Sequence, residues 1–185
     1  ARNIILGMGG SATVDGGTGI LRALGIRFLN AEGKPLPDNP AGLAGLGLID
    51  ITGMDKRILD IELTILCDVK NPLLGARGAA AAFGPQKGAT EEGVKKLEAA
   101  LSVFRDITLK QTGKDMASVQ SGGTAGGAAA GLYAFLNARL VSGIDHFLQM
   151  TGFDEALSKA SLLITGEGSI DEQTLEGKAP FGVAS

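Results

Sequence analysis

Residues 4–17 read Ile-Ile-Leu-Gly-Met-Gly-Gly-Ser-Ala-Thr-Val-Asp-Gly-Gly, an apolar run that leads directly into a loop rich in glycine. The apolar run predicts a short β-strand, and residues 18–24, which Gly25 follows, predict a short helix. A strand, a glycine-rich loop and a helix in this order are typical of α/β proteins, in which ligands bind at the ends of the strands.

The same alternation of strand and helix patterns continues beyond residue 25. Short apolar runs predict further strands at residues 26–29, 48–51, 60–69 and 161–165. Helices are predicted, from periodicity or composition, at residues 91–111, 126–137, 143–150 and 153–159. We therefore predict an α/β fold with a mixed or parallel sheet and flanking helices.

The glycine loop, residues 7–17, is the first candidate site. Glycine leaves successive backbone N–H groups accessible, and such groups can bind an anion together with the hydroxyls of Ser11 and Thr13. A tight turn into a helix is the alternative interpretation. Five glycines together with Ser, Thr and Asp in one loop favour a binding role.

A second interpretation of this loop is a dinucleotide-binding fold. Gly7, Gly9 and Ala12 have the spacing of a weak form of that pattern, and Glu32 follows about 20 residues later. The pattern requires the helix to begin near the second glycine, whereas residues 13–17 prolong the loop. A nucleotide-binding oxidoreductase domain therefore remains an alternative function.

Two polar clusters follow the strand predicted at 60–69. Asp68 and Asn71 suit magnesium or a substrate hydroxyl, but an Asx-turn that closes the strand explains them equally well. Arg77 and Lys87 each place one cation among glycines, which suits a phosphate or a carboxylate but also a solvated turn. The chain has no Gly-x-x-x-x-Gly-Lys-Ser/Thr run, which disfavours a P-loop NTPase.

The last polar cluster lies in residues 165–180. A carboxylate between glycines, Glu167, is followed by Asp171 and then by Lys178. Phosphoryl transfer needs such groups, because a carboxylate can hold a metal or accept a proton and a cation stabilises developing negative charge. We therefore predict a functional role for this segment.

Composition excludes several other classes of function. The formal net charge is −3 and no long basic run is present, which argues against nucleic acid or an anionic membrane as partner. No apolar run is long enough for a membrane span. Cys67 and His146 are the only residues of their types, which excludes an internal disulfide framework and a histidine-clustered metal site. A single cysteine fits a reducing compartment, and we expect the protein in the cytoplasm.

Several stretches together resemble one protein family. The chain closely resembles bacterial glycerate kinases of type I in residues 5–17, 67–73, 75–80, 83–89 and 165–171, and residues 177–184 extend the match. These stretches occur in the family's order and run over essentially the whole chain. Together they are far more specific than any single glycine loop.

The resemblance implies an ATP-dependent kinase that phosphorylates D-glycerate at the 2-hydroxyl, with ATP and Mg²⁺ bound. It also implies two α/β domains, one of them Rossmann-like, with the active site in the cleft between them. By this resemblance Asp68, Asp171 and Lys178 are catalytic, and Asp68 is the candidate metal ligand. The residues implied in binding substrate or phosphate are Gly9, Gly10, Ser11, Thr13, Asp15, Asn71, Arg77, Lys87, Gly166, Glu167 and Gly168.

The match corresponds to the middle of a family member, so we expect residues 1–185 to be an internal fragment. Residues 1–30 and 160–185 are then expected to border the cleft between the domains. Because phosphoryl transfer depends on holding donor and acceptor together in a closed site, we expect the isolated fragment to be inactive. A non-catalytic α/β domain is a further alternative, and the sequence makes no prediction of the oligomeric state.

Overall fold

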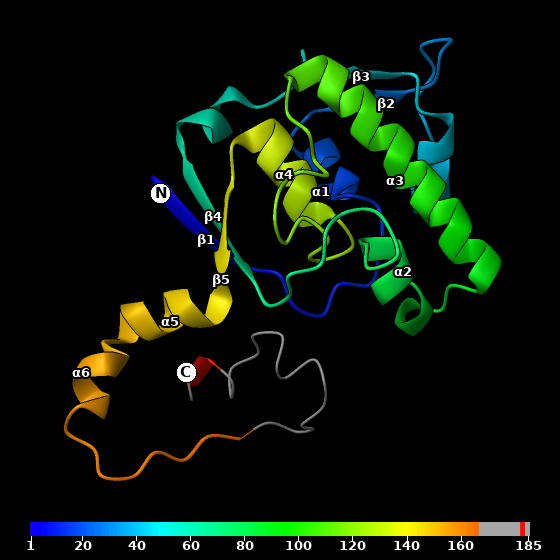
Figure 1. Cartoon of the computed structure of the whole chain (residues 1–185). Helices are drawn as coiled ribbons and strands as arrows, with labels where there is room; N and C mark the ends of the chain where they lie inside the picture. Colours follow the sequence, from blue (N-terminus) through cyan, green and yellow to red (C-terminus); the bar gives the residue numbers. More distant parts are fainter. Residues whose placement is uncertain (167–181, 184–185) are drawn as a thin grey trace.

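The computed structural model describes residues 1–166 and 182–183 of the chain. Its main sheet has the parallel strands β1 (Asn3–Gly7), β4 (Glu62–Cys67) and β5 (Arg139–Ser142), with β4 in the middle. The register pairs Gly7 with Leu66 and Cys67 with Ser142. All three strands therefore end at the same edge of the sheet, and the loops after β1 and β4 begin side by side (Figure 1).

A smaller antiparallel pair, β2 (Arg27–Leu29) and β3 (Leu48–Asp50), lies beside the long helix α3 (Figure 1). The helices are α1 (Thr18–Ala23), α2 (Ala79–Phe83), α3 (Glu91–Thr112), α4 (Ala128–Leu136), α5 (Gly143–Thr151) and α6 (Phe153–Leu157). Short 3-10 segments are η1 (Pro40–Gly45), η2 (Lys56–Asp60) and η3 (Pro85–Lys87). The predicted α/β fold with a mixed or parallel sheet and flanking helices is confirmed.

The hydrophobic core lies between the main sheet and α3. Helix α4 contacts β4 and β5 as well as α1 and α3, so it occupies the middle of the molecule (Figure 1). Phe104 of α3 is fully buried, and its ring centroid lies 5.7 Å from that of Phe28 and 6.2 Å from that of Phe135. Burial of one such side chain stabilises the fold by roughly 2–3 kcal/mol, so this aromatic cluster anchors α3 over the core.

Helix α3 begins where the sequence predicts and ends one residue beyond. The Thr90 hydroxyl accepts a hydrogen bond of 3.1 Å from the N–H of Gly93, and Gly113 ends the helix with a φ of 73°. No helix in the described part of the chain combines the length and the apolar character that a membrane span requires.

The glycine loop is held against α4 by a close approach of two backbones. The N–H of Gly16 donates a hydrogen bond of 3.0 Å to the carbonyl oxygen of Gly126, just before α4. A Cβ on Gly131 would lie 2.1 Å from the carbonyl oxygen of Gly16, so only glycine fits at this position of α4. Gly16 and Gly131 therefore serve the close packing of the glycine loop against α4.

The predicted strand at 161–165 is wrong. These residues have no regular secondary structure, and Leu162 and Ile164 are 76% and 84% exposed. A strand needs a neighbour for its backbone N–H and C=O groups, and within the described residues the main sheet ends at β5.

β5 and α2 were not predicted from the sequence. β5 has the sequence Arg-Leu-Val-Ser, too short and too polar for a strand pattern, and it becomes a strand because it pairs with residues 64–67 of β4. α2 spans only the five residues 79–83, which is too short to show helical periodicity.

Candidate active site

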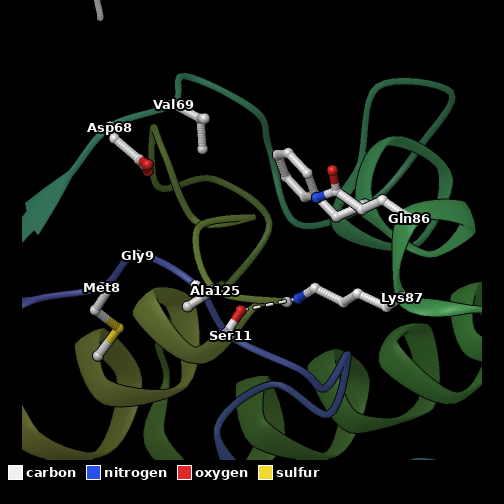
Figure 2. Close-up of a pocket in the computed structure, with 11 residues that line it drawn as sticks. Met8, Gly9, Ser11, Asp68, Val69, Gln86, Lys87 and Ala125 are labelled. Atoms are coloured by element: carbon white, nitrogen blue, oxygen red, sulfur yellow. Dashed lines mark hydrogen bonds between the residues drawn. The ribbon is translucent and has the colours of Figure 1, made fainter. Parts of the chain in front are cut away.

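The loops after β1 and β4 enclose a small polar hollow at one edge of the main sheet (Figure 2). Because β1 and β4 are parallel neighbours, the glycine loop and Asp68 leave the sheet beside each other. The hollow has a volume of about 110 Å³. Its lining residues are Met8, Gly9, Gly10, Ser11, Asp68, Val69, Phe83, Gln86, Lys87, Ala125 and Gly126.

The first part of the glycine loop presents unpaired backbone N–H groups. Gly9 and Gly10 are exposed, and neither their N–H groups nor that of Ser11 donates to an acceptor among the described residues. Gly10 has a φ of 68°, which glycine adopts without strain. Successive N–H groups of this kind can bind an anion, as the sequence predicts.

Lys87 closes one side of the hollow. It ends η3, and the next residue, Gly88, has a φ of 88° that turns the chain away. The Lys87 Nζ donates hydrogen bonds of 2.8 Å to the Ser11 hydroxyl and 2.7 Å to the carbonyl oxygen of Thr13 (Figure 2). Burial lowers the pKa of Lys87, and the charge of Asp15 opposes this shift. The structure thus brings together two residues that the sequence placed in separate clusters.

Asp15 faces α1 rather than the polar hollow. Its Oδ1 accepts a hydrogen bond of 3.0 Å from the N–H of Gly17, and its Oδ2 accepts one of 3.2 Å from the Thr18 hydroxyl. The Thr13 hydroxyl donates to Asp15 Oδ1 at 3.3 Å. These contacts close the N-terminal end of α1, and neither Thr13 nor Asp15 lines the hollow.

A second recess borders the glycine loop from the side of α1 and α4. It has a volume of about 530 Å³ and a mostly apolar wall that includes Leu6, Ile20 and Ala128. Thr13 and Asp15 line this recess, and its wall shares Met8, Gly9, Ser11 and Ala125 with the polar hollow. The glycine loop therefore separates the polar hollow from a larger, mostly apolar recess.

Asp68 follows β4 directly, and its exposed carboxylate lines the polar hollow (Figure 2). No residue of the described chain gives it a hydrogen bond or an ion pair. Asn71 is buried, and its side-chain amide donates a hydrogen bond of 2.8 Å to the carbonyl oxygen of Arg77. Asn71 and Arg77 lie outside the hollow, where Asn71 fixes the loop that follows Asp68.

Asp68 fits the way in which proteins usually bind magnesium. Mg²⁺ is held by one or two carboxylates together with substrate phosphates and waters. Within residues 1–166 and 182–183, no three or more His, Cys, Asp or Glu side chains form a group that could hold a metal ion. A magnesium ion at Asp68 would therefore depend for much of its coordination on waters and on phosphate oxygens that reach it from outside the hollow.

The remaining predicted residues lie in the C-terminal segment. Gly166 is exposed, lines neither recess and has open space around its Cα. Glu167, Gly168, Asp171 and Lys178 lie outside the residues that the structure describes.

Gln86 and Ala125 are among the residues that line the hollow without having been predicted from the sequence. Gln86 lies next to Lys87, and its place in the glycine-flanked stretch 83–89 was the only available signal. Ala125 has a φ of 55°, which is uncommon for a residue with a side chain. It lies in the glycine-rich run 122–127, whose small residues also suit close packing of helices.

A family model described as the glycerate kinase family matches residues 1–185. The chain belongs to the glycerate kinase family. The glycerate kinase of Halalkalibacterium halodurans is 48% identical over 181 residues, which are 98% of this chain and 48% of that relative. The glycerate 2-kinase of Escherichia coli K12 is 44% identical over 185 residues, which are 100% of this chain and 49% of that relative.

A solved structure leads to the same glycerate kinase family. The crystal structure of a Salmonella typhimurium LT2 protein assigned as glycerate kinase 2 matches with a TM-score of 0.85 and 45% identity, over 99% of this chain and 49% of that chain. The chain thus spans about half the length of the curated relatives it matches. The family resemblance found in the sequence is confirmed, whereas the roles of individual residues stay predictions.

Proposed function

We propose that the protein containing this chain phosphorylates D-glycerate with ATP and forms 2-phospho-D-glycerate. The observation that carries the proposal is the convergence of the glycine loop, Asp68 and Lys87 on one polar hollow, in a chain of the glycerate kinase family. The name of the E. coli relative, a glycerate 2-kinase, supports the 2-hydroxyl as the acceptor. ATP is the expected donor for a kinase of this family.

The groups around the hollow suit phosphoryl transfer. The glycerate hydroxyl loses a proton as its oxygen bonds to the γ-phosphorus of ATP, and ADP leaves with the electrons of the broken P–O bond. Asp68 is exposed and unpaired within the described chain, so it can accept that proton or hold Mg²⁺. When bound, Mg²⁺ would neutralise phosphate charge, while the N–H groups of Gly9 and Gly10 can receive an anionic oxygen of the acceptor acid.

Residues beyond the hollow complete the proposed site. From the family resemblance we assign catalytic roles to Asp171 and Lys178. The same resemblance assigns binding roles to Arg77, Gly166, Glu167 and Gly168. Thr13, Asp15 and Asn71 do not line the hollow and contribute by fixing the loops that form it.

We further propose that residues 1–185 belong to a two-domain enzyme and that the hollow opens into the cleft between the domains. Residues 1–30 and 160–185 border this cleft. The proposal is supported by the chain's spanning about half the length of its curated relatives. A cytoplasmic location is part of the same proposal, because the chain has a single cysteine.

The geometry does not favour a nucleotide-binding oxidoreductase. Residues 8–17 separate the end of β1 from the start of α1, and α1 has only six residues. A dinucleotide-binding fold needs its helix to begin close to the second glycine, so that the helix N-terminus meets the pyrophosphate.

A coupled kinase assay tests the proposed function. The protein is expressed from its complete natural reading frame and supplied with ATP, Mg²⁺ and D-glycerate. We expect ADP release that depends on D-glycerate, and a ³¹P NMR spectrum of 2-phosphoglycerate. ADP release independent of glycerate would contradict the substrate, and 3-phosphoglycerate as the product would contradict the acceptor position.

A further inference from the structure

The polar hollow has the dimensions and the charge of a site for a small hydroxy acid. We propose that it binds the carboxylate of the acid acceptor through Lys87 and Ser11, and that the nucleotide phosphates bind outside it. The inference rests on the proposed function, because it assigns the acceptor's place within the same site.

The volume of the hollow separates the two substrates. At about 110 Å³ it has room for roughly four water molecules. Pockets for larger ligands such as nucleotides usually measure about 300–1,000 Å³. The hollow therefore has room for a three-carbon acid but not for a whole nucleoside triphosphate.

The charge of the hollow also favours the acid over the nucleotide phosphates. Among the described residues that line it, only Lys87 and Asp68 are charged, so their formal charges cancel. A carboxylate carries one negative charge and pairs with one lysine, while a neutral hydroxyl can lie beside Asp68. A triphosphate would bring several negative charges to Lys87 and Asp68, so it would need the charge of its own Mg²⁺ in addition to that of Lys87. The lining therefore matches a hydroxy acid better than a phosphate chain.

The hydrogen bonds between Lys87 and the glycine loop leave one donor free on Lys87 and one on Ser11 for a carboxylate. An ammonium group has three N–H donors, and Lys87 uses two of them, toward the Ser11 hydroxyl and the Thr13 carbonyl oxygen. The Ser11 hydroxyl accepts from Lys87, so its own O–H is free to donate elsewhere. One N–H of Lys87 and one O–H of Ser11 remain for a ligand, beside the unpaired N–H groups of Gly9 and Gly10.

The arrangement also orients the acid. Figure 2 shows the Asp68 carboxylate and the Lys87 ammonium approaching the hollow from different sides. A hydroxy acid whose carboxylate contacts Lys87 and Ser11 directs its hydroxyl side toward Asp68. This is the group from which a proton must leave, so the anchor at Lys87 positions the acceptor for transfer.

The test compares D-glycerate with D-glyceramide, which has the same shape but no carboxylate charge. Lys87→Met and, as control, Lys96→Met are made in the protein from its complete natural reading frame. Lys96 is exposed on α3 and pairs with Glu92 at 2.6 Å, away from the hollow. Steady-state kinetics give KM for glycerate and for ATP, and calorimetry gives the affinity for each acceptor without nucleotide.

We expect Lys87→Met to raise KM for glycerate and to weaken its calorimetric affinity about tenfold or more. KM for ATP and the affinity for glyceramide should change less than about twofold, and Lys96→Met should behave as the wild type. If Lys87→Met does not fold, Lys87→Gln carries the same expectation. A rise in KM for ATP alone, or equal effects on both acceptors, would overturn the proposal.

Failure of the proposed function is distinguishable from failure of this inference. A wild-type protein that does not phosphorylate glycerate contradicts the proposed function. In that case calorimetry still decides whether glycerate binds through Lys87. Glycerate binding that Lys87→Met does not weaken contradicts the carboxylate assignment, even where the wild-type enzyme is active.

Discussion

A Cβ atom on Gly126 would lie 2.0 Å from the carbonyl oxygen of Thr13. The loop before α4 and the glycine loop therefore touch through their backbones at a point where no side chain fits. Gly126 lines the polar hollow, and its carbonyl oxygen accepts the hydrogen bond from Gly16. The shape of the site depends on this contact.

Gly126→Ala should destabilise the protein and displace the glycine loop. The matched control is Gly113→Ala, because Gly113 has a similar φ, 73° against 66°, but open space around its Cα. Both substitutions introduce backbone strain, and only Gly126→Ala adds a clash. We expect it to cost about 2 kcal/mol more than the control in urea unfolding. Equal losses would show that the contact does not restrain the loop.

Asp68→Asn should lower kcat for glycerate phosphorylation by on the order of 10²-fold or more. The amide can neither accept the hydroxyl proton nor replace a negatively charged metal ligand. Asp60→Asn is the control, since Asp60 is exposed at the end of η2 and lies outside the hollow. An unchanged kcat with an intact fold would show that Asp68 serves only in the turn that closes the strand.

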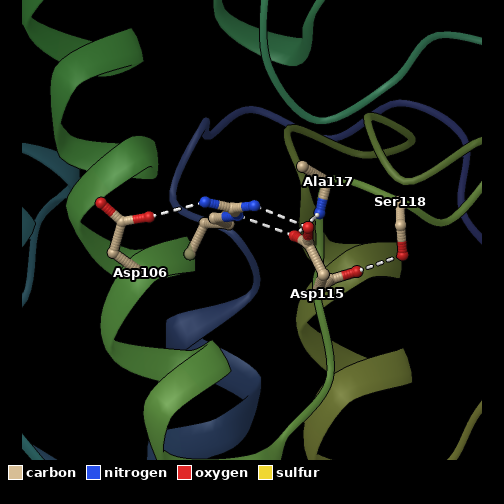
Figure 3. Close-up of polar contacts among 5 residues, drawn as sticks. Asp106, Asp115, Ala117 and Ser118 are labelled. Atoms are coloured by element: carbon tan, nitrogen blue, oxygen red, sulfur yellow. Dashed lines mark hydrogen bonds and ion pairs between the residues drawn. The ribbon is translucent and has the colours of Figure 1, made fainter.

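The pair of Arg105 and Asp115 should make stability depend on acid pH. Arg105 donates hydrogen bonds of 2.7 and 2.6 Å to the Asp115 carboxylate, which also accepts one of 2.9 Å from the N–H of Ala117 (Figure 3). These contacts lower the pKa of Asp115 below its ordinary 3.8. A lowered folded-state pKa means that the stabilisation is present above pH 3.8 and is lost as the pH falls below it.

Asp115→Asn should therefore lower Tm at pH 7 and reduce the loss of Tm below about pH 4. The exposed Asp154→Asn, at the start of α6, serves as the control. Melting curves recorded from pH 7 to pH 2.5 measure the effect. If the Tm of Asp115→Asn falls below pH 4 as steeply as that of the wild type, other carboxylates cause the loss of stability.

Residues 1–185 expressed alone should not phosphorylate glycerate, even when folded and supplied with ATP and Mg²⁺. Transfer requires donor and acceptor to be held in line in a site that excludes water, and part of the family's chain does not provide all of that positioning. A coupled assay, with circular dichroism to confirm folding, measures the outcome. Robust turnover would refute the placement of the site in a cleft between two domains.

Much of the fold could be predicted from local patterns in the sequence. β1 and β4 are apolar runs, and α3 has both an apolar face and the Thr90 cap, so each carries its own signal. β5 has no such signal, because its conformation depends on pairing with β4. Residues 161–165 show the converse, since an apolar run alone does not make a strand without a neighbour.

The loops that form the candidate site could be predicted from the sequence, but the contacts between their side chains could not. Asp68 lies beside the glycine loop because β1 and β4 are parallel neighbours, whereas the sequence left open whether the sheet is mixed or parallel. The contact between Lys87 and Ser11 joins residues 76 positions apart, which no local pattern indicates. Asp15 and Asn71 have the residue types of ligand contacts, yet their side chains bond to the protein's own backbone.

The most direct test of the account is a crystal structure of the protein, from its complete natural reading frame, with D-glycerate, Mg²⁺ and a non-hydrolysable ATP analogue. We predict glycerate in the polar hollow, with its carboxylate within hydrogen-bond distance of Lys87 Nζ and its 2-hydroxyl on the Asp68 side. Nucleotide phosphates in the hollow, or glycerate bound away from both residues, would contradict the account.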